Sequence, residues 1–446
     1  MNKIITLAFF IPFYTIFAQG CPVDGSTITI TSSTTFPAGC HTKKVRIVIP
    51  SNTSNIVVDG NGMELNGLNQ SSPNDVNVPY NVGEEPLENG IELQPKTSNI
   101  TIKNFVIRNY RFGVNLVMDN TYTDVFETRW ETGENNLALK SEYQGYATNT
   151  NKILNNSFYN IHGTAINLNW FTHHNLVQGN LIVNSFYSGI YIYPYASDNQ
   201  IYSNRIWDSG YYQFSMISRK ITNSSFKREA IAVDGSDHND IFNNIFTNNA
   251  GGGVFLYKNC RERFDDPTVK HMPRENPSDY NTIRRNDFFN QPKGINVASR
   301  NDMIYRYKCG DPTMYEYHPA LTDIIGQAYV AAFRNYVQTD DYPYNDTMQY
   351  PLFYRDYARN NTIDGNLFRT NTLAIKIQDD NNTVTNNTFI GEGYEEHILI
   401  GAPVRKKALN LPVSGVIINS NSYLNQATTN EKTDEVFDIS KIIQAN

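Results

Sequence analysis

Ionisable and aromatic side chains gather in the middle of the chain at positions that repeat from one segment to the next. Two segments, each a small residue followed by alternating apolar residues, end in Asp234 and in Tyr257, four residues after the small one. Lys258 follows at offset five, and Arg300 stands at offset six in the next such segment. A carboxyl group, a phenol and two cations are side chains that proton transfer to and from a bound substrate uses. The spacing therefore predicts a catalytic cluster.

Cleavage of an acidic polysaccharide by β-elimination is the chemistry that this set suits best. It needs a group that neutralises the uronate carboxylate, a base for the adjacent proton and an acid for the leaving oxygen. We expect Lys258 as the base, because neighbouring cations favour its neutral amine. Tyr257 is expected as the acid or, with an Arg beside it, as the base. The candidate set is Lys258, Arg300, Tyr257, Asp234 and Glu262 as catalytic residues, Arg228, His238, Arg261, Arg263 and Tyr193 as substrate-binding residues, and Glu229, Asp234 and Asp237 as ligands of a Ca²⁺ ion that neutralises the uronate.

Other readings of the same residues stay open. A glycoside hydrolase would use two carboxyl groups, for which Glu229, Asp234, Asp237 and Glu262 are candidates. A C5-epimerase starts by removing the same proton as a lyase. A secreted protein that binds carbohydrate without cleaving it could present the same surface, and a charge ladder needs no function at all. The adjacent pair Asp379-Asp380 is interpreted as a corner of the fold.

Two recurring phrases predict the elements that position these residues. The first has two Asn residues five positions apart around an apolar residue, and it occurs eight times: Asn99/Asn104, Asn151/Asn156, Asn175/Asn180, Asn199/Asn204, Asn239/Asn244, Asn281/Asn286, Asn361/Asn366 and Asn382/Asn387. The second is the small-residue phrase, found at positions such as Gly90 and Gly113, which are 23 residues apart. Short alternating strands at a fixed period of this length are typical of the coils of a parallel β-helix. Asn suits the corners because it tolerates left-handed backbone geometry and bonds to Asn in the next coil.

This pattern resembles the right-handed parallel β-helix superfamily, which includes pectate lyases, chondroitinase B, alginate lyases, polygalacturonases and phage tailspikes. The resemblance covers roughly residues 50–425. It implies an all-β solenoid of about ten coils, with polysaccharide-directed chemistry on one face. Lys and Arg beside carboxylate-bound Ca²⁺ resemble the arrangement in chondroitinase B and related alginate lyases.

The organisation of the chain follows from the repeats. We predict a signal peptide at 1–20, an N-terminal cap at 21–50, the parallel β-helix at 51–425 and a C-terminal cap or tail at 426–446. Four insertions interrupt the repeats without shifting their phase, at about 119–150, 207–229, 260–280 and 301–358. If they emerge at similar corners, they wall a groove along one sheet.

Composition and the N-terminal segment indicate the cellular compartment of the protein and limit the classes of partner. The chain has 446 residues and a net charge of −7, which argues against nucleic acid as a partner. A positive start and a 15-residue uncharged run from Ile4 to Ala18 predict export, so the protein is expected to be secreted or periplasmic, with no membrane span. Export permits disulfides, and proximity favours Cys21–Cys40 and Cys260–Cys309 among three connectivities. The expected partner is a polysaccharide substrate, acidic in character.

Overall fold

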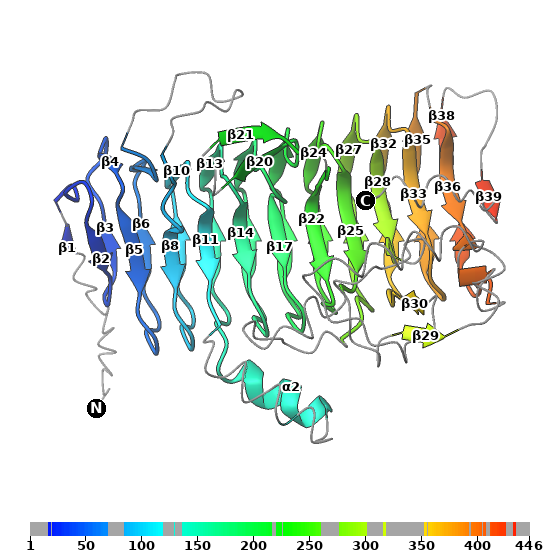
Figure 1. The fold of residues 1–446 in the computed structure, drawn as a ribbon, viewed down its shortest axis with the longest axis horizontal. Coiled ribbons are helices and arrows are strands. Elements are labelled where there is room, and N and C mark those ends of the chain that lie inside the picture. The colour runs from blue at the N-terminus through cyan, green and yellow to red at the C-terminus, as the bar shows by residue number, and fades with distance from the viewer. Residues whose placement is uncertain are drawn as a thin grey trace, which may run out of the picture.

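The computed structural model of the protein describes most of the repeat region. The described residues are 17–18, 20–69, 84–118, 129, 136–215, 220–224, 226–259, 276–300, 315–317, 352–354, 356–391, 394–403, 405–406, 411–424 and 431–433. Within them the chain forms three long parallel sheets, which run along the axis of one elongated stack of coils (Figure 1). This arrangement is a parallel β-helix, and it confirms the predicted fold class.

Among the described residues, each complete coil contributes one short strand to each sheet. Sheet A has 12 strands: β1 (Phe17–Ala18), β3 (Thr34–Thr35), β6 (Val57–Asp59), β9 (Thr101–Lys103), β12 (Lys152–Leu154), β15 (Leu176–Gln178), β18 (Gln200–Tyr202), β23 (Asp240–Phe242), β26 (Thr282–Arg284), β31 (Thr362–Asp364), β34 (Thr383–Thr385) and β37 (Ile417–Asn419). Sheet C has 11: β4 (His41–Lys43), β7 (Glu64–Asn66), β10 (Val106–Arg108), β13 (Ser157–Tyr159), β16 (Leu181–Val183), β19 (Arg205–Trp207), β24 (Ile245–Thr247), β27 (Asp287–Phe289), β32 (Leu367–Arg369), β35 (Thr388–Ile390) and β38 (Ser422–Leu424). Sheet B has 12: β2 (Thr27–Thr29), β5 (Arg46–Ile49), β8 (Asn89–Leu93), β11 (Phe112–Leu116), β14 (Thr164–Leu168), β17 (Ile190–Ile192), β22 (Glu229–Asp234), β25 (Gly252–Tyr257), β28 (Lys293–Val297), β33 (Leu373–Ile377), β36 (Glu396–Ile400) and β39 (Glu431–Thr433).

The repeat spacing sets the register. The apolar residue directly after each small residue stacks on its counterpart, as Ile231 does on Val254 and Val254 on Ile295, and these residues are fully buried in the core. A small residue is required before them because the interior is tight: a Cβ added at Gly253 would lie 2.4 Å from the Phe288 ring. The small-residue phrase therefore marks where sheet B begins in each coil.

The Asn phrase builds buried ladders along the corners. Asn204 donates both its backbone N–H and its side-chain amide to Asn244 Oδ1, at 2.9 and 3.0 Å, and Asn244 donates to Asn286 in the same way. The predicted amide bonding between coils is confirmed. The predicted left-handed geometry is found mostly one residue earlier, as at Asn243, because the ladder Asn itself turns inward.

Asn99 and Asn104 depart from the expected phase. Both have positive φ values, and Asn99 donates to Asn55 at an exposed corner, where it takes the place of the left-handed residue rather than that of a ladder Asn. The first of the eight phrases is therefore shifted by one residue.

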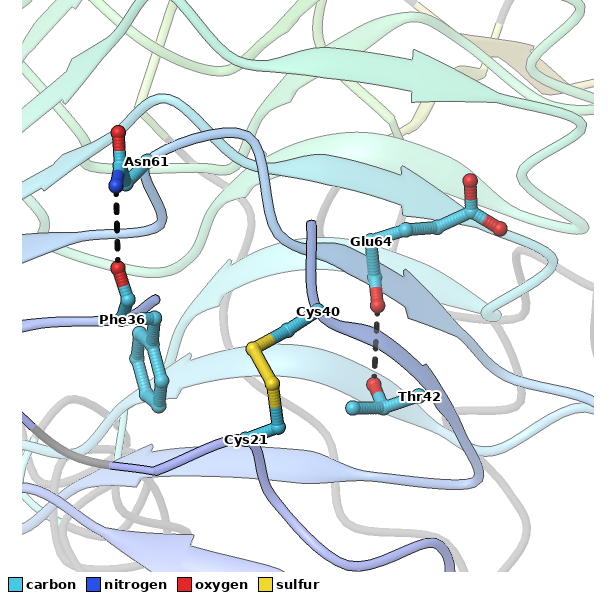
Figure 2. Close-up of a disulfide and its surroundings, with 6 residues drawn as sticks. All are labelled: Cys21, Phe36, Cys40, Thr42, Asn61 and Glu64. Atoms are coloured by element: carbon cyan, nitrogen blue, oxygen red, sulfur yellow. Dashed lines mark hydrogen bonds between the residues drawn. A yellow bond between two sulfur atoms is a disulfide. The ribbon is translucent and has the colours of Figure 1, made fainter. Parts of the chain in front are cut away.

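The ends of the solenoid differ from the predicted boundaries. Residues expected to form an N-terminal cap supply β2 to β5, so the coils begin about one turn earlier than predicted. The predicted disulfide between Cys21 and Cys40 is confirmed, and it lies beside the first coils (Figure 2). Part of the predicted tail supplies β39, which pairs with β36. Cys260 and Cys309 lie outside the described residues.

Insertions flank sheet B on both edges. Successive strands follow the order sheet B, sheet A, sheet C, so the insertions at 119–150, 260–280 and 301–358 leave after sheet B strands, and that at 207–229 enters before β22. They contain helix α2 (Asn136–Gln144) and two antiparallel hairpins, β20 (Tyr212–Ser215) with β21 (Lys220–Asn223) and β29 (Tyr315–Tyr317) with β30 (Leu352–Tyr354). Figure 1 shows β20–β21 along one edge of the stack and α2 and β29–β30 along the other. None of the described helices is long and apolar enough to cross a membrane.

Candidate functional site

The outer face of sheet B carries a second apolar cluster, separate from the interior core. Tyr191, Ala232 and Tyr257 are buried there, with Tyr193 and Phe255 packed against them. Because side chains alternate along a strand, Ile231 and Val233 point inward while Ala232 points outward. The aromatic cluster therefore lies on the face that the insertions flank.

A phenol and a carboxylate form the centre of this face. The Tyr257 hydroxyl donates to Glu229 Oε1 at 2.7 Å, although the two residues occupy opposite ends of the neighbouring strands β25 and β22. Glu229 is only 3% exposed and also accepts from Ser188 Oγ at 3.4 Å. The Tyr257 side chain must therefore lean back along the strand to meet Glu229.

Two arginines lie close to this pair. The Arg300 guanidinium carbon is 4.6 Å from the centre of the Tyr257 ring, and that of Arg228 is 3.8 Å from the centre of the Tyr187 ring. Arg228 also donates to the Tyr187 hydroxyl. Such stacking suits the planar guanidinium, whose N–H groups lie at its edge.

Burial governs the protonation of the phenol. It raises the pKa of Tyr257 well above its usual value, and the Glu229 carboxylate raises that pKa further, while Arg228 and Arg300 oppose the rise. The phenol therefore keeps its proton at neutral pH. Of the two roles predicted for Tyr257, proton donation is the one that its surroundings favour.

Asp234 forms a second polar unit beside the first. It is fully buried, and it accepts from the Tyr191 hydroxyl at 2.8 Å, the Asn259 backbone N–H at 2.8 Å and the Asn259 side-chain amide at 2.9 Å. Asp234 and Tyr257 stack on one another in the register, as their shared offset predicted. We call Tyr191, Glu229, Asp234, Tyr257 and Asn259 together the tyrosine–carboxylate cluster.

A buried aspartate holds the backbone that carries both candidate cations. Asp356 accepts from the Lys258 N–H at 2.6 Å with Oδ1 and from the Arg300 N–H at 2.9 Å with Oδ2. Burial raises the pKa of Asp356 to about 7, although these two amides and the Arg300 guanidinium oppose the rise. The Lys258 Nζ atom lies 5.1 Å from the centre of the Tyr357 ring. Asp356 thus links the end of β25 to the turn after β28.

The structure separates some residues that the sequence grouped. Asp237 lies at the corner that follows sheet B, where it accepts from Lys140 of α2 at 2.6 Å and from Asn276 at 3.1 Å. His238 stacks on Tyr280 at 5.1 Å at the same corner, away from the outer face of sheet B. The sequence reasoning failed here because the chain turns between Asp234 and Asp237.

The predicted calcium ligands do not converge. Glu229 is bonded to Tyr257, Asp234 to Tyr191 and Asn259, and Asp237 to Lys140. Within the described part of the chain, no three Asp, Glu, His or Cys side chains come together as metal ligands. Grouping Glu229, Asp234 and Asp237 as one ligand set was therefore wrong for these residues.

Several predicted residues remain without a structural account, and others were missed. Glu262, Arg261 and Arg263 lie outside the described residues. Tyr193 packs beside Tyr191, with ring centres 4.5 Å apart, and its substrate-binding role stays a prediction. Tyr191 and Asp356 were not predicted. For Tyr191 the sequence did hold a signal, because Tyr191 occupies the outward-facing position of the phrase Gly189-Ile-Tyr-Ile.

The rival carboxyl pair has a different setting. Asp379 accepts from Arg405 at 2.8 Å and from the Ala358 N–H at 2.9 Å, and Asp380 accepts from Arg405 as well. Burial raises the pKa of Asp379 to about 6. This buried ion pair holds a corner of the solenoid, in keeping with the interpretation of Asp379-Asp380 as a corner.

Comparison with known proteins bears on the fold. Residues 132–264 match a family model described as a right-handed β-helix region. No curated protein matches the chain in sequence. Three similar solved structures are the catalytic unit of a thermostable alpha-1,3-glucanase from Streptomyces thermodiastaticus, DFA-IIIase from Arthrobacter chlorophenolicus, and the tailspike protein of E. coli bacteriophage HK620 in complex with a pentasaccharide.

The likeness to these structures is remote. Their sequence identities are 12%, 10% and 11%, and their TM-scores are 0.47, 0.40 and 0.43, in the same order. The alignments cover 93%, 88% and 91% of this chain, but 64%, 70% and 57% of theirs, so the chain spans less than two thirds of the glucanase and of the tailspike. Likenesses this remote carry no conclusion about the activity of the chain. The family-model match over residues 132–264 and the three parallel sheets together confirm the right-handed parallel β-helix fold predicted from the repeats.

Proposed function

We propose that the protein cleaves a uronate-containing polysaccharide by β-elimination on the outer face of sheet B. The observation that carries this proposal is the setting of Tyr257, a buried phenol that donates to Glu229 and is covered by the Arg300 guanidinium. A phenol that keeps its proton beside two arginines combines an acid for the leaving oxygen with cations for the uronate carboxylate.

Each residue then has a role that its contacts support. Arg300 and Arg228 bind the uronate carboxylate. Their positive charge makes the proton on the carbon beside that carboxylate more acidic. Lys258, whose backbone Asp356 fixes, takes that proton as the neutral amine, and Tyr257 donates its own proton to the leaving glycosidic oxygen as the bond from that oxygen to the uronate breaks. Tyr193 and Tyr187 offer ring faces to neighbouring sugar units. In these steps the arginines supply the positive charge that a Ca²⁺ ion would otherwise provide.

Hydrolysis is the second candidate, and one observation favours it. Glu229 and Asp234 lie on the same strand, both on the outer face and both bonded to tyrosine hydroxyls. A pair of carboxyl groups is what a glycoside hydrolase uses as acid and as base or nucleophile. In that case Tyr257 and Tyr191 would orient the carboxyl groups rather than transfer protons to sugar.

The deciding experiment separates the two bonds that can break. The purified protein is incubated with polygalacturonate, alginate, hyaluronan and chondroitin, each with calcium or with a chelator. Elimination creates an unsaturated uronate that absorbs ultraviolet light, whereas hydrolysis releases reducing ends without that absorbance. We expect absorbance to rise with one polymer and to be lost in Tyr257→Phe but not in the control Tyr202→Phe, whose ring stacks on Phe242 on sheet A. Reducing ends without absorbance would replace elimination by hydrolysis.

A further inference from the structure

A chain of amide hydrogen bonds crosses the outer face of sheet B toward the tyrosine–carboxylate cluster. Asn167 Nδ2 donates to Asn115 Oδ1 at 2.9 Å, Asn115 Nδ2 to Asn89 Oδ1 at 3.0 Å, and Asn89 Nδ2 to Glu92 Oε2 at 2.7 Å. Arg46 forms an ion pair with Glu92 at the far end. The Asn ladders at the corners point into the solenoid. This chain of amides lies instead on the outer face of sheet B, which the insertions flank.

The carboxylate fixes the direction of every amide in this chain. An ionised Glu can only accept hydrogen bonds, so Asn89 must turn its NH₂ group toward Glu92 and its oxygen toward the next coil. Asn115 and Asn167 must then follow in the same sense. The chain therefore ends in a carbonyl oxygen, Asn167 Oδ1, that faces away from Glu92.

That terminal oxygen has no hydrogen-bond partner among the described residues, although Asn167 is only 2% exposed. A buried acceptor without a donor costs about 1–3 kcal/mol, and such groups are rare in folded proteins. Here the cost cannot be avoided by rotating the amide, because rotation would break the bond to Asn115. The oxygen is thus held ready for a donor that the described residues do not provide.

Its position is next to the proposed site. Asn167 pairs in register with Tyr191, whose hydroxyl donates to Asp234. One strand spacing separates Asn167 from Tyr191 and two separate it from β22, about 5 and 10 Å. On the other side of the cluster, Asn296 pairs with Phe255, is 3% exposed and also has an amide oxygen without a described partner.

We propose that Asn167 Oδ1 is a specificity-determining acceptor that binds a hydroxyl group of the sugar unit next to the reacting one. An acceptor oriented by a carboxylate attracts O–H donors and repels anions. The substrate therefore carries a free hydroxyl, and neither a sulfate nor a carboxylate, at this subsite. This inference rests on the proposed function, because it assumes that a polysaccharide lies across the cluster.

The test measures binding rather than cleavage. Isothermal titration uses the full chain with chondroitin, chondroitin sulfate, polygalacturonate, alginate and dextran. For whichever polymer binds, we expect Asn167→Ala to weaken affinity about 10-fold, the loss of one hydrogen bond to a buried acceptor. Glu92→Gln, which frees the chain of amides to reverse, should weaken it about 3-fold at an unchanged unfolding midpoint. Asn99→Ala, at an exposed Asn–Asn contact, serves as the matched control and should bind normally.

The outcomes separate this inference from the proposed function. Unchanged affinity in both Asn167→Ala and Glu92→Gln would overturn the acceptor role and leave the proposed function intact. Binding of dextran alone, weakened by Asn167→Ala, would overturn the uronate substrate but support the acceptor. Equal affinity for chondroitin and its sulfated form would overturn the exclusion of anions. If the unmodified protein binds none of the five polymers, both proposals fail.

Discussion

Tyr257 and Glu229 are joined by a 2.7 Å hydrogen bond that runs obliquely between two neighbouring strands of sheet B. In the register, Tyr257 lies opposite Asp234 and Glu229 lies opposite Gly252. The bond therefore exists only because the phenol reaches back over the strand, past Ala232, to the carboxylate at its start.

Removing the Tyr257 hydroxyl tests whether this bond serves catalysis. Tyr257→Phe keeps the ring under Arg300 but takes away the proposed proton donor, so we expect the elimination rate to fall 10²- to 10⁴-fold. Glu229 loses a donor as well, which should lower the free energy of unfolding by about 1–3 kcal/mol. Initial rates and denaturant unfolding measure the two effects. A variant that is destabilised but retains its rate would show that the hydroxyl only supports the fold.

Replacing Arg300 by lysine tests carboxylate recognition. Arg300→Lys keeps the positive charge and the backbone N–H that Asp356 holds, but loses the planar fork that grips a carboxylate with two bonds. We expect KM for the uronate polymer to rise about 10-fold with a smaller change in kcat. Arg205→Lys on the outer side of sheet C is the matched control, and its KM should not change. Equal effects in both variants would contradict a role for Arg300 in binding.

The repeats predicted the features that depend on the coil period. Once the period places Asp234 and Tyr257 at the same offset, their stacking follows from the geometry of parallel strands. The Asn204–Asn244 amide bonds follow in the same way. Such contacts join equivalent positions of adjacent coils, so they are visible as spacing alone.

Contacts between residues that do not occupy equivalent positions of adjacent coils could not be predicted from the repeats. Asp356 meets Lys258 across 98 residues, after an insertion whose length has no relation to the repeat. Lys140 reaches Asp237 from an insertion three coils earlier in the stack, which removes Asp237 from the expected ligand set. The direction of the Tyr257 side chain depends on its rotamer, which does not appear in a pattern of apolar and polar residues.

Asp356 should make stability depend on pH. Its pKa is raised by burial from 3.8 to about 7, despite the Lys258 and Arg300 amides and the Arg300 charge, and nearby Asp379 adds to the rise. The folded state thus binds this proton more tightly than the unfolded state, so the contribution to stability is greatest below about pH 4 and is lost as the pH rises toward 7. Asp356→Asn cannot ionise and escapes that loss.

The measurement is the unfolding free energy of the two proteins at pH 4, 6 and 8. We expect the difference, variant minus unmodified, to move in favour of Asp356→Asn by about 1–4 kcal/mol between pH 4 and pH 8. The absolute value at pH 4 is expected to favour the unmodified protein, because an amide NH₂ faces one of the two backbone N–H donors. A difference that does not vary with pH would show that Asp356 ionises at its ordinary pKa.

Replacing one buried Asn of the corner ladder should destabilise the solenoid more than replacing an exposed Asn. Asn244 accepts from the Asn204 N–H and side chain through Oδ1 and donates to the Ile201 carbonyl at 2.8 Å, all within the buried corner. Asn244→Ala leaves these groups without partners, which should cost about 3–5 kcal/mol. Asn290→Ala removes an exposed Asn–Asn contact of the same kind and should cost less than about 1 kcal/mol. Urea unfolding compares the two, and similar losses would mean that the ladder contributes no more than a surface contact, leaving the stacked apolar columns alone to hold the coils in register.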